Sequence, residues 1–400
     1  MKQPLTQLLF VFNIVDYPNS VYVYKIIFLL ALQCLIKLFY AVGLLLVSAM
    51  VSLILEVIQQ CSCFGIKCID NTSTLGRLEL GIETNDDLLD SNQKGILMEH
   101  LKSLSIDDGE KKENNDKFLG THELISGQLK HTTEGLPSFL CLNEEDIKKI
   151  RSNPEQAIID EILLFSNEEV IELLHYIREE PISEKKYSNG IRDKDRPPGM
   201  CLNDFMKHPN VKKSSLHREH VIALRLYTSA AYKYINNPLR DIQRKELNIK
   251  HPLAACVLYI QEGIKKLRNV ISMKEETQRQ SGIIINETTI LWRGMKNVHA
   301  SNHFILRGGA ELAPMSTTSE FQVAVEYGTC REGSLLLKII VPTALQHGAN
   351  LAWLSCFPGE AEVLYPPLTF LKSLKRKQEF KCEENGIVVN ILELEPDLSA

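Results

Sequence analysis

Two glutamates separated by one residue, Glu360 and Glu362, have the spacing in this chain that most plainly suggests chemistry. They lie between a short aromatic loop, Ser-Cys-Phe-Pro-Gly, and an apolar run that is typical of a strand. Alternate residues of a strand face the same side, so a strand here predicts that both carboxylates point into one cleft. Two carboxylates on one face repel each other unless a cation or a cationic transition state lies between them. The pair therefore indicates a site that stabilises positive charge.

Two further motifs precede the glutamates. Arg293 stands in Leu-Trp-Arg-Gly-Met at the end of a predicted strand, and Ser316 and Thr317 begin a hydroxyl patch, Ser-Thr-Thr-Ser, at the start of another. A guanidinium fork matches the oxygens of a phosphate, and Gly294 would let the backbone approach closely. These residue types suit a substrate that carries a pyrophosphate.

An arginine, a serine/threonine patch and a Glu-x-Glu pair, in this order, resemble the signature of the arginine-class (R-S-E motif) mono-ADP-ribosyltransferases. Residues 223–240 add a second likeness, because their Tyr-Thr-x-x-x-Tyr-x-x-Ile-Asn-x-x-Leu-Arg pattern resembles a helix of actin-modifying toxins and animal ecto-enzymes. The resemblance covers about residues 201–396. It implies NAD as co-substrate, a protein acceptor with an exposed arginine, release of nicotinamide and no metal.

The resemblance also implies a role for each motif residue. Glu362 is the catalytic glutamate that contacts the ribose bearing the nicotinamide, and Glu360 acts on the acceptor. Arg293, Gly294, Ser316 and Thr317 bind NAD, and Ser316 also stabilises the cleft by a hydrogen bond to the catalytic glutamate or to the nicotinamide ribose. The family's arginine-directed members carry glutamate at both positions of the pair, as this chain does.

Some assignments remain open on the sequence alone. Phe357 stands where the family places an aromatic for target recognition, but simple loop packing is the alternative. Tyr227 is a candidate to stack near the nicotinamide, although a helical tyrosine is more often part of a core. Ser319 is interpreted as a helix cap, and His217 and His220 as surface residues.

Two other functions use the same residues. An NAD glycohydrolase gives ADP-ribose to water, and only the positioning of the acceptor separates it from a transferase. A catalytically inactive, membrane-tethered binding module is the alternative from another class. Loss of Arg293, Ser316 or Glu362 would favour the binding module, and all three are present.

The surrounding elements predict an α+β fold. Residues 155–178 are expected to form two short helices, with caps at Asn153 and Ser166, and residues 187–200 an exposed loop. Two amphipathic helices follow. Short apolar runs at 282–292, 335–341, 361–364 and 386–394 then predict strands. Helices followed by strands match the family's layout, a split β-sandwich with a helical amino-terminal part.

Composition narrows the class of protein. The 400-residue chain is 44% hydrophobic and 24% charged, as ordinary globular proteins are. Its net charge of −5 gives no support to nucleic-acid binding, which usually needs a basic face. No Gly-x-Gly-x-x-Gly sequence opens a helix after a strand, so NAD would be held without a Rossmann site.

The first sixty residues differ from the rest. Residues 38–55 run without a charge and are long enough to span a bilayer as a helix. A secretory signal usually has a shorter apolar core nearer the start, and a buried core helix is the other alternative. We predict a single-pass membrane anchor within residues 1–60, a polar linker over 61–134 and a catalytic domain over 135–400.

The sequence gives weaker signals for the orientation of the predicted anchor in the membrane and for the chemical state of the cysteines that follow it. Lys25 and Lys37 precede the apolar run and only Lys67 follows closely, which favours a luminal or extracellular catalytic domain. Sequons at Asn71 and Asn286 fit that side. Cysteines 61, 63 and 68 leave S-acylation and disulfides open, and their spacing matches no standard zinc site.

Overall fold

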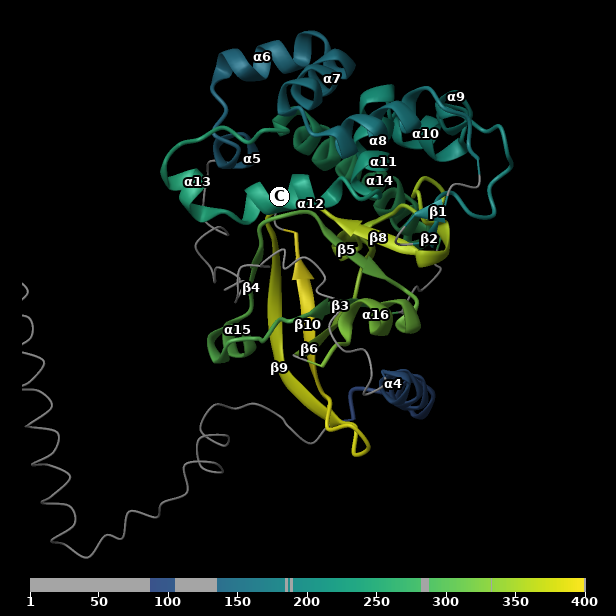
Figure 1. Cartoon of the computed structure of the whole chain (residues 1–400), viewed down its shortest axis with the longest axis vertical. Coiled ribbons are helices and arrows are strands. Elements are labelled where there is room, and N and C mark those ends of the chain that lie inside the picture. The colour runs from purple at the N-terminus through teal and green to yellow at the C-terminus, as the bar shows by residue number, and fades with distance from the viewer. Residues whose placement is uncertain are drawn as a thin grey trace, which may run out of the picture. The chain divides into compact units, whose positions relative to one another are not determined.

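The computed structural model of this chain describes residues 87–104, 135–183, 186–187, 190–281, 288–331 and 333–398. They fall in one compact unit, Arg77–Ala400. The helices and 3-10 turns (Figure 1) are α4 (Ser91–Ser103), α5 (Gly135–Phe139), α6 (Glu144–Ser152), α7 (Pro154–Phe165), α8 (Glu168–Arg178), α9 (Leu202–Met206), α10 (Pro209–Ser214), α11 (Arg218–Tyr227), α12 (Tyr232–Arg240), α13 (Ile242–Glu246), α14 (Ala254–Gln280), α15 (Asn302–Arg307), α16 (Phe321–Gly328), η2 (Ala344–Gln346) and η3 (Pro358–Glu360). The strands are β1 (Lys186–Tyr187), β2 (Gly190–Ile191), β3 (Thr289–Lys296), β4 (Gly309–Glu311), β5 (Met315–Thr318), β6 (Ser334–Val341), β7 (Ala349–Asn350), β8 (Glu362–Tyr365), β9 (Thr369–Lys381) and β10 (Val388–Asp397).

Helices α5 to α12 and α14 share one apolar core, and together with α13 they gather at one end of the sheet (Figure 1). Pro154 occupies the first position of α7, where its missing N–H is no loss. Asn167 caps α8 by accepting the Val170 N–H at 3.2 Å. The prediction of two helices is confirmed, but the predicted cap at Ser166 is wrong, because Ser166 ends α7 in the left-handed conformation.

The large strands form an eight-stranded mixed sheet in the order β4-β9-β10-β6-β3-β5-β8-β7. Only β6 and β10 are parallel neighbours within it. Together with the helical part, this sheet confirms the α+β prediction. Strands β6, β8 and β10 lie where the sequence predicts strands, and β3 covers the described end of the predicted run 282–292.

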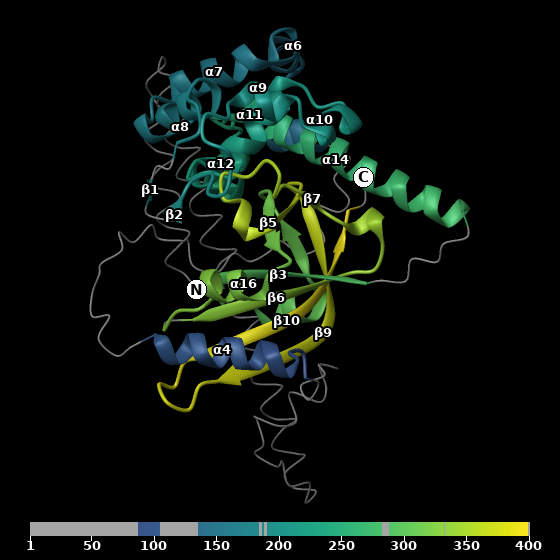
Figure 2. The same ribbon diagram turned by 90° about the vertical axis from the view of Figure 1, so that its right-hand side faces the viewer.

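The sheet is nearly divided between β3 and β5. Strand β3 pairs with β6 along its full length but with β5 at a single position, Trp292 opposite Thr318. Figure 2 shows β5 and β7 on the side of the helices, with β6, β9 and β10 extending away from them. This division fits the split layout expected from the sequence.

Strand β9 escapes prediction because its sequence, Leu-Lys-Ser-Leu-Lys-Arg-Lys-Gln-Glu-Phe-Lys, is charged and lacks an apolar run. It is nonetheless paired with β10 from Lys381 to Phe370. The ion pair between Arg376 and the buried Glu393 holds one of its charged side chains, and Lys338 lies 3.2 Å from the same carboxylate. Paired backbone groups and matched charges therefore add to the apolar contacts that Leu371 and Phe380 make.

Helix α4 lies inside the segment 61–134 that the sequence predicts as a polar linker, so that prediction is wrong for this part. Asp90 and Gln93 form a capping box at its start, with bonds of 2.8 and 3.1 Å. Leu97 and Leu101 are fully buried in a cluster with Trp292 of β3 and residues of α16, β6 and β10. Figure 2 shows α4 running beside β9. The sequence conceals this helix because its apolar partners lie far along the chain.

No helix in the described ranges is both long and apolar enough to cross a membrane. The apolar run 38–55 lies outside those ranges, as do both sequons and the three clustered cysteines. The six cysteines within them, residues 141, 201, 256, 330, 356 and 382, are free thiols.

The packing of α4 predicts that a leucine in this segment stabilises the whole unit. Replacing the fully buried Leu97 by alanine leaves a cavity and should lower the free energy of unfolding of the full chain by about 2–5 kcal/mol. Denaturant titration measures this, and Leu164→Ala, at a leucine that is 85% exposed on α7, is the matched control with little expected change. Equal stability of both variants and the parent would mean that α4 does not dock.

Candidate active site

Arg293 lies where β3 separates from β5. Side chains alternate along β3, so Arg293 and Met295 share one face while Trp292 packs on Phe321 of α16 on the other. Nη1 of Arg293 donates to the Ser316 carbonyl of β5 at 2.8 Å. This bond joins the two strands beside their single paired position and brings the predicted arginine and serine motifs together.

A buried carboxylate holds Arg293 from the other side. Glu311 of β4 is only 6% exposed and receives two bonds from Arg240, of 3.1 and 3.2 Å, while Nη2 of Arg293 lies 3.5 Å from it. Burial opposes ionisation of Glu311, but the two guanidinium groups keep its pKa below the ordinary value. Two cations and one carboxylate leave one positive charge in excess. Nε of Arg293 is buried and has no hydrogen-bond partner among the described residues.

Glu362 begins β8 and is 5% exposed. Burial raises the pKa of its carboxyl group to about 7; Glu360 adds to the rise, whereas hydrogen bonds from Ser316 and Ser355 and the charge of Arg293 oppose it. The Ser355 hydroxyl lies 3.5 Å from Oε2. Glu362 is therefore a desolvated carboxyl group poised near neutrality, surrounded by hydroxyl donors.

Glu360 does not share a strand with Glu362, so the prediction of an alternating strand pair is wrong. Glu360 closes the 3-10 turn η3, and Ala361 then adopts a left-handed conformation with φ of 46° before β8 begins. Tyr327 of α16 donates its hydroxyl to Glu360 Oε1 at 2.5 Å. Burial raises the pKa of Glu360. The hydrogen bond from Tyr327 opposes this rise, and the charge of Glu326 adds to it. A turn and a helix thus position the first glutamate, and a strand the second.

Some hydroxyl groups of the Ser-Thr-Thr-Ser patch bond backbone carbonyls, and one acts on Glu362. Thr317 is buried and donates to the Val363 carbonyl at 2.7 Å, so it locks β5 to β8. Thr318 donates to the Glu360 carbonyl at 2.7 Å and accepts the Glu320 N–H at 2.9 Å. The interpretation of Ser319 as a helix cap is wrong, because Glu320 is the N-cap residue of α16 and no side chain caps this helix; the Ser319 hydroxyl lies 3.4 Å from the Glu320 carboxylate. The Ser316 hydroxyl acts on Glu362, where it lowers the pKa of the carboxyl group.

Gly294 serves packing rather than a ligand. A Cβ atom at this position would lie 1.9 Å from the Ala324 carbonyl oxygen and 2.5 Å from the Gly328 amide nitrogen. Helix α16 therefore crosses β3 in direct backbone contact. The interpretation that this glycine admits NAD finds no support in this geometry, although the contact does fix the helix that carries Tyr327.

Tyr227 is a core residue near the site. It is 3% exposed, donates its hydroxyl to the Pro314 carbonyl at 2.7 Å and accepts from Asn236 at 3.2 Å. Burial raises the pKa of its hydroxyl group, and Arg293 and Glu362 are among the charges that act on it. The core alternative is the one that the structure favours, because little of the ring is left for stacking on a ligand. Tyr227 instead ties α11 to the segment before β5.

Phe357 is half buried at the start of η3, directly before the turn that carries Glu360. Its N–H donates to the Ser355 hydroxyl at 3.1 Å, and the same hydroxyl lies against Glu362. Target recognition by Phe357 stays a prediction.

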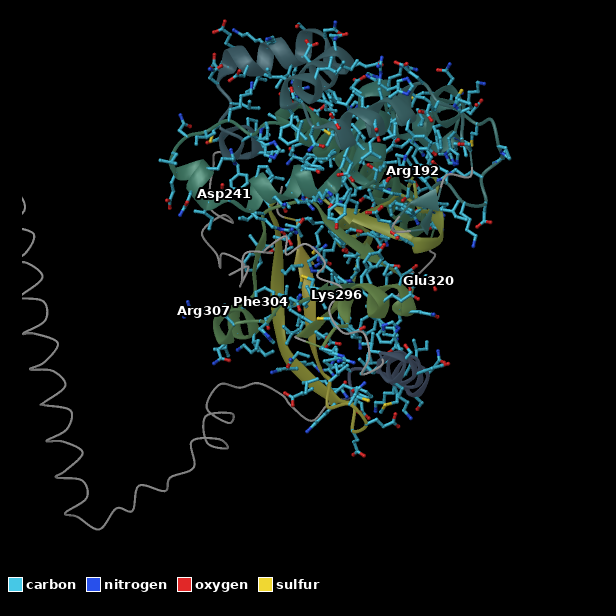
Figure 3. All side chains as sticks on the ribbon, in the orientation of Figure 1. Arg192, Asp241, Lys296, Phe304, Arg307 and Glu320 are labelled. Carbon is cyan, nitrogen blue, oxygen red and sulfur yellow. The ribbon has the colours of Figure 1, made fainter. Side chains whose placement is uncertain are left out.

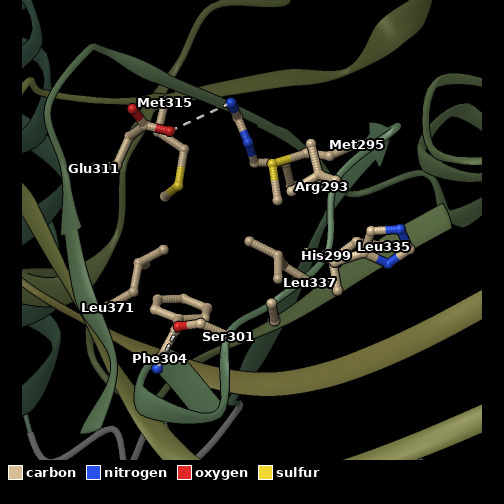
Figure 4. Close-up of a pocket in the computed structure, with 12 residues that line it drawn as sticks. Arg293, Met295, His299, Ser301, Phe304, Glu311, Met315, Leu335, Leu337 and Leu371 are labelled. Carbon is tan, nitrogen blue, oxygen red and sulfur yellow. Dashed lines mark hydrogen bonds and ion pairs between the residues drawn. The ribbon is translucent and has the colours of Figure 1, made fainter. Parts of the chain in front are cut away.

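A small pocket lies on the Arg293 face of the sheet (Figure 4). Arg293 and Glu311 lie at one side of it, and Phe304, Ser301 and Leu371 at the other. Neither Glu360 nor Glu362 lines it. Because its remaining lining is mostly apolar, this pocket belongs to the core behind the arginine rather than to the carboxylates.

The interpretation of His217 and His220 as surface residues is wrong for His220, since it is 2% exposed. Nδ1 of His220 accepts the His217 N–H at 3.1 Å and so caps the start of α11. Among the described residues, these histidines and Glu219 form the one group close enough to ligate a metal ion. The capping bond accounts for their arrangement.

Sequence reasoning missed four residues that complete the site: Arg240, Glu311, Tyr327 and Ser355. Arg240 ends the Tyr-Thr pattern of residues 223–240, so its position is visible in the sequence but its partner is not. Glu311 and Tyr327 stand in segments without any recognisable motif. Their roles arise from strand order and from the crossing of α16 over β3, which no local pattern encodes.

The sequence model of the family described as NAD:arginine ADP-ribosyltransferase matches residues 183–388, just over half of the chain. The chain therefore belongs to this family. The match spans the helical part from α9 onward and every motif residue discussed above. NAD is accordingly its co-substrate, and the protein is a transferase of ADP-ribose.

Solved structures give more distant similarities. The mono-ADP-ribosyltransferase ART2.2, a eukaryotic protein, as a mutant in complex with NAD, is 16% identical, with a TM-score of 0.39 over 64% of this chain and 90% of that one. HopU1 of Pseudomonas syringae pv. Tomato DC3000 is 15% identical, with a TM-score of 0.34 over 57% and 97%. Exoenzyme S from Pseudomonas aeruginosa is 15% identical, with a TM-score of 0.31 over 48% and 86%. A search of curated proteins gave no match.

The raised pKa of Glu362 predicts the pH dependence of NAD cleavage. A carboxylate must be ionised to stabilise positive charge, and a pKa of about 7 leaves Glu362 mostly protonated at pH 6. The kcat/KM for NAD should therefore rise several-fold between pH 6 and pH 8. A stopped assay of nicotinamide release across this range measures it, and a flat or falling profile would contradict the assignment of Glu362.

Proposed function

We propose that this protein transfers ADP-ribose from NAD to arginine side chains of proteins and releases nicotinamide. The observation that carries the proposal is the juxtaposition of two half-buried or buried carboxyl groups, Glu360 and Glu362, beside a fixed excess of positive charge at Arg293. The three groups divide the tasks that such a reaction requires.

Arg293 would hold the pyrophosphate of NAD. Its guanidinium is fixed by Ser316 and Glu311, and its side chain is 15% exposed, so it needs no reorganisation to meet a phosphate. Arg240 completes the positive field, because its bonds to Glu311 prevent that carboxylate from neutralising Arg293 alone.

Glu362 would stabilise the positive charge that develops on the ribose as its bond to the nicotinamide nitrogen breaks. The hydroxyls of Ser316 and Ser355 hold the carboxylate in place. A buried position strengthens this electrostatic effect, since little water screens it.

Glu360 would act on the acceptor. An arginine guanidinium has a pKa above about 12, so it attacks only if a base orients it and takes a proton as the new carbon–nitrogen bond forms. A raised pKa suits that proton transfer, and the Tyr327 hydroxyl keeps the carboxylate aimed. A water molecule in place of the guanidinium would give free ADP-ribose, which is the glycohydrolase alternative.

The test uses the full chain with NAD labelled on its adenylate, agmatine as acceptor, and the variants Glu362→Gln and Glu360→Gln. Glu362→Gln should lower both labelled agmatine and free ADP-ribose by about 100-fold or more, because it removes the charge stabilisation. Glu360→Gln should lower only the labelled agmatine, by about 100-fold. Glu379→Gln, at an exposed strand position, is the control and should behave as the parent.

Other outcomes assign another function. Free ADP-ribose without labelled agmatine in the parent would identify a glycohydrolase. Binding of NAD without turnover would identify an inactive binding module.

We further propose that residues 38–55 anchor the chain in a membrane, with the catalytic unit on the luminal or extracellular side. The support is the length of the uncharged run and the preceding lysines. The full chain should remain in the membrane pellet after carbonate extraction at high pH, and a chain lacking residues 38–55 should be released. Release of the full chain would contradict the anchor.

A further inference from the structure

The segment before the glutamate pair, residues 352–356, has no helix or strand ladder to satisfy its backbone. Its five successive carbonyl groups nonetheless all accept hydrogen bonds from outside the segment. The acceptor carbonyls are Ala352 (3.1 Å, from Arg196), Trp353 (2.7 Å, from Arg196), Leu354 (2.8 Å, from Arg225), Ser355 (2.9 Å, from Arg196) and Cys356 (2.6 Å, from the Asp193 N–H). Two guanidinium groups and one amide therefore fix the whole segment.

One buried carboxylate organises the two arginines. The Asp193 side chain is fully buried; its Oδ1 lies 2.9 Å from Arg196 and 3.2 Å from Arg225, and its Oδ2 lies 2.8 Å from Arg225. Tyr176 donates its hydroxyl to Oδ2 at 2.7 Å. We call Asp193, Arg196 and Arg225 the Asp193 clamp.

Asp193 and Arg196 lie in a stretch that the sequence predicts as an exposed loop, residues 187–200, and this prediction is wrong for its centre. Arg192 and Asp193 are 4% and 3% exposed. Figure 3 shows Arg192 where the helical part meets the sheet. Phe205 packs beneath the clamp, with its ring centre 4.1 Å from the Arg225 guanidinium and 5.0 Å from that of Arg196.

The clamped segment leads directly into the site. Ser355, held by its carbonyl, places its hydroxyl between the Phe357 N–H at 3.1 Å and the Glu362 carboxylate at 3.5 Å. The N–H of Cys356 donates to Thr228 of the helical part at 3.0 Å. Through the segment 352–356, the clamp is therefore connected to both the catalytic carboxylate and the turn that carries Glu360.

We propose that Arg196 and Arg225, assembled on Asp193, are positioning residues that hold residues 352–356 so that the enzyme transfers ADP-ribose to an arginine rather than to water. The inference rests on the proposed function. A guanidinium acceptor needs one orientation between Phe357 and Glu360, whereas water needs none, so loosening the segment should harm transfer more than hydrolysis.

Arg196→Lys is the decisive variant because Arg196 is the more accessible arginine, with its side chain 11% exposed, and a lysine keeps the charge but loses the fork that bonds three carbonyls. Arg244→Lys is the matched control. Arg244 likewise donates to three carbonyls, of Pro238, Ile249 and Phe139, but in the helical part away from the segment. Both variants lose comparable backbone bonds, and only one loosens the clamp.

The first readout is the product ratio. With the full chain, Arg196→Lys should lower the ratio of labelled agmatine to free ADP-ribose about five- to ten-fold and raise the KM for agmatine several-fold. The KM for NAD should stay within about twofold. Arg244→Lys should lower the melting temperature without changing the ratio.

The second readout does not depend on transfer. The chain has two tryptophans; Trp292 is buried, and Trp353 lies in the clamped segment, stacked on His208 at 4.4 Å between ring centres. Acrylamide quenching of Trp353 should increase about twofold or more in Arg196→Lys but not in Arg244→Lys. A Trp353→Phe chain identifies the contribution of Trp292.

An unchanged product ratio or unchanged quenching in Arg196→Lys overturns the proposal, since the arginine is then only structural. A parent that makes free ADP-ribose but no labelled agmatine refutes arginine transfer itself, and the quenching result still decides whether the clamp holds the segment.

Discussion

One hydrogen bond, from Arg293 to the Ser316 carbonyl, spans the place where the sheet almost comes apart. Beyond the pair Trp292 and Thr318, strands β3 and β5 share no ladder. The helical part supplies Arg240 and the other strands supply Glu311 and Glu362. The site exists because the sheet divides here, and the arginine keeps the two edges in register.

Three buried carboxyl groups, those of Glu311, Asp193 and Glu362, differ in whether cations or hydroxyl groups stabilise them. Glu311 and Asp193 each lie between two guanidinium groups, which satisfy them as ions. Glu362 receives hydroxyl groups instead, and burial raises its pKa to about 7. The acid without a paired cation is thus the one left to respond to charge on a substrate. The paired acids are structural in effect, since their arginines hold the surrounding backbone.

The motifs of the site were visible in the sequence because Arg293, Ser316 and the glutamate pair each occupy a short local pattern. The sequence also indicated helices before strands. It did not reveal that Glu360 leaves the strand, because Ala361 carries no sign of a left-handed conformation. Nor did it reveal Asp193, since a charged stretch with Pro and Gly has the composition of a solvated loop. Burial of such residues depends on partners far away in the chain, which composition cannot identify.

Helix α4 has a practical consequence for where this protein can be cut. The family match begins at residue 183, and the helical part at Gly135, yet the groove that α4 fills is lined by Trp292, Phe321 and Val389. A fragment trimmed to either boundary would expose that apolar surface to water and leave Gln378 and Lys338 without Leu88. Such a fragment would tend to self-associate. If it were inactive, the cause would be the lost packing of α4 and not the lack of a catalytic residue. The smallest fragment that keeps α4 and the contacts of Leu88 begins ahead of Asp87.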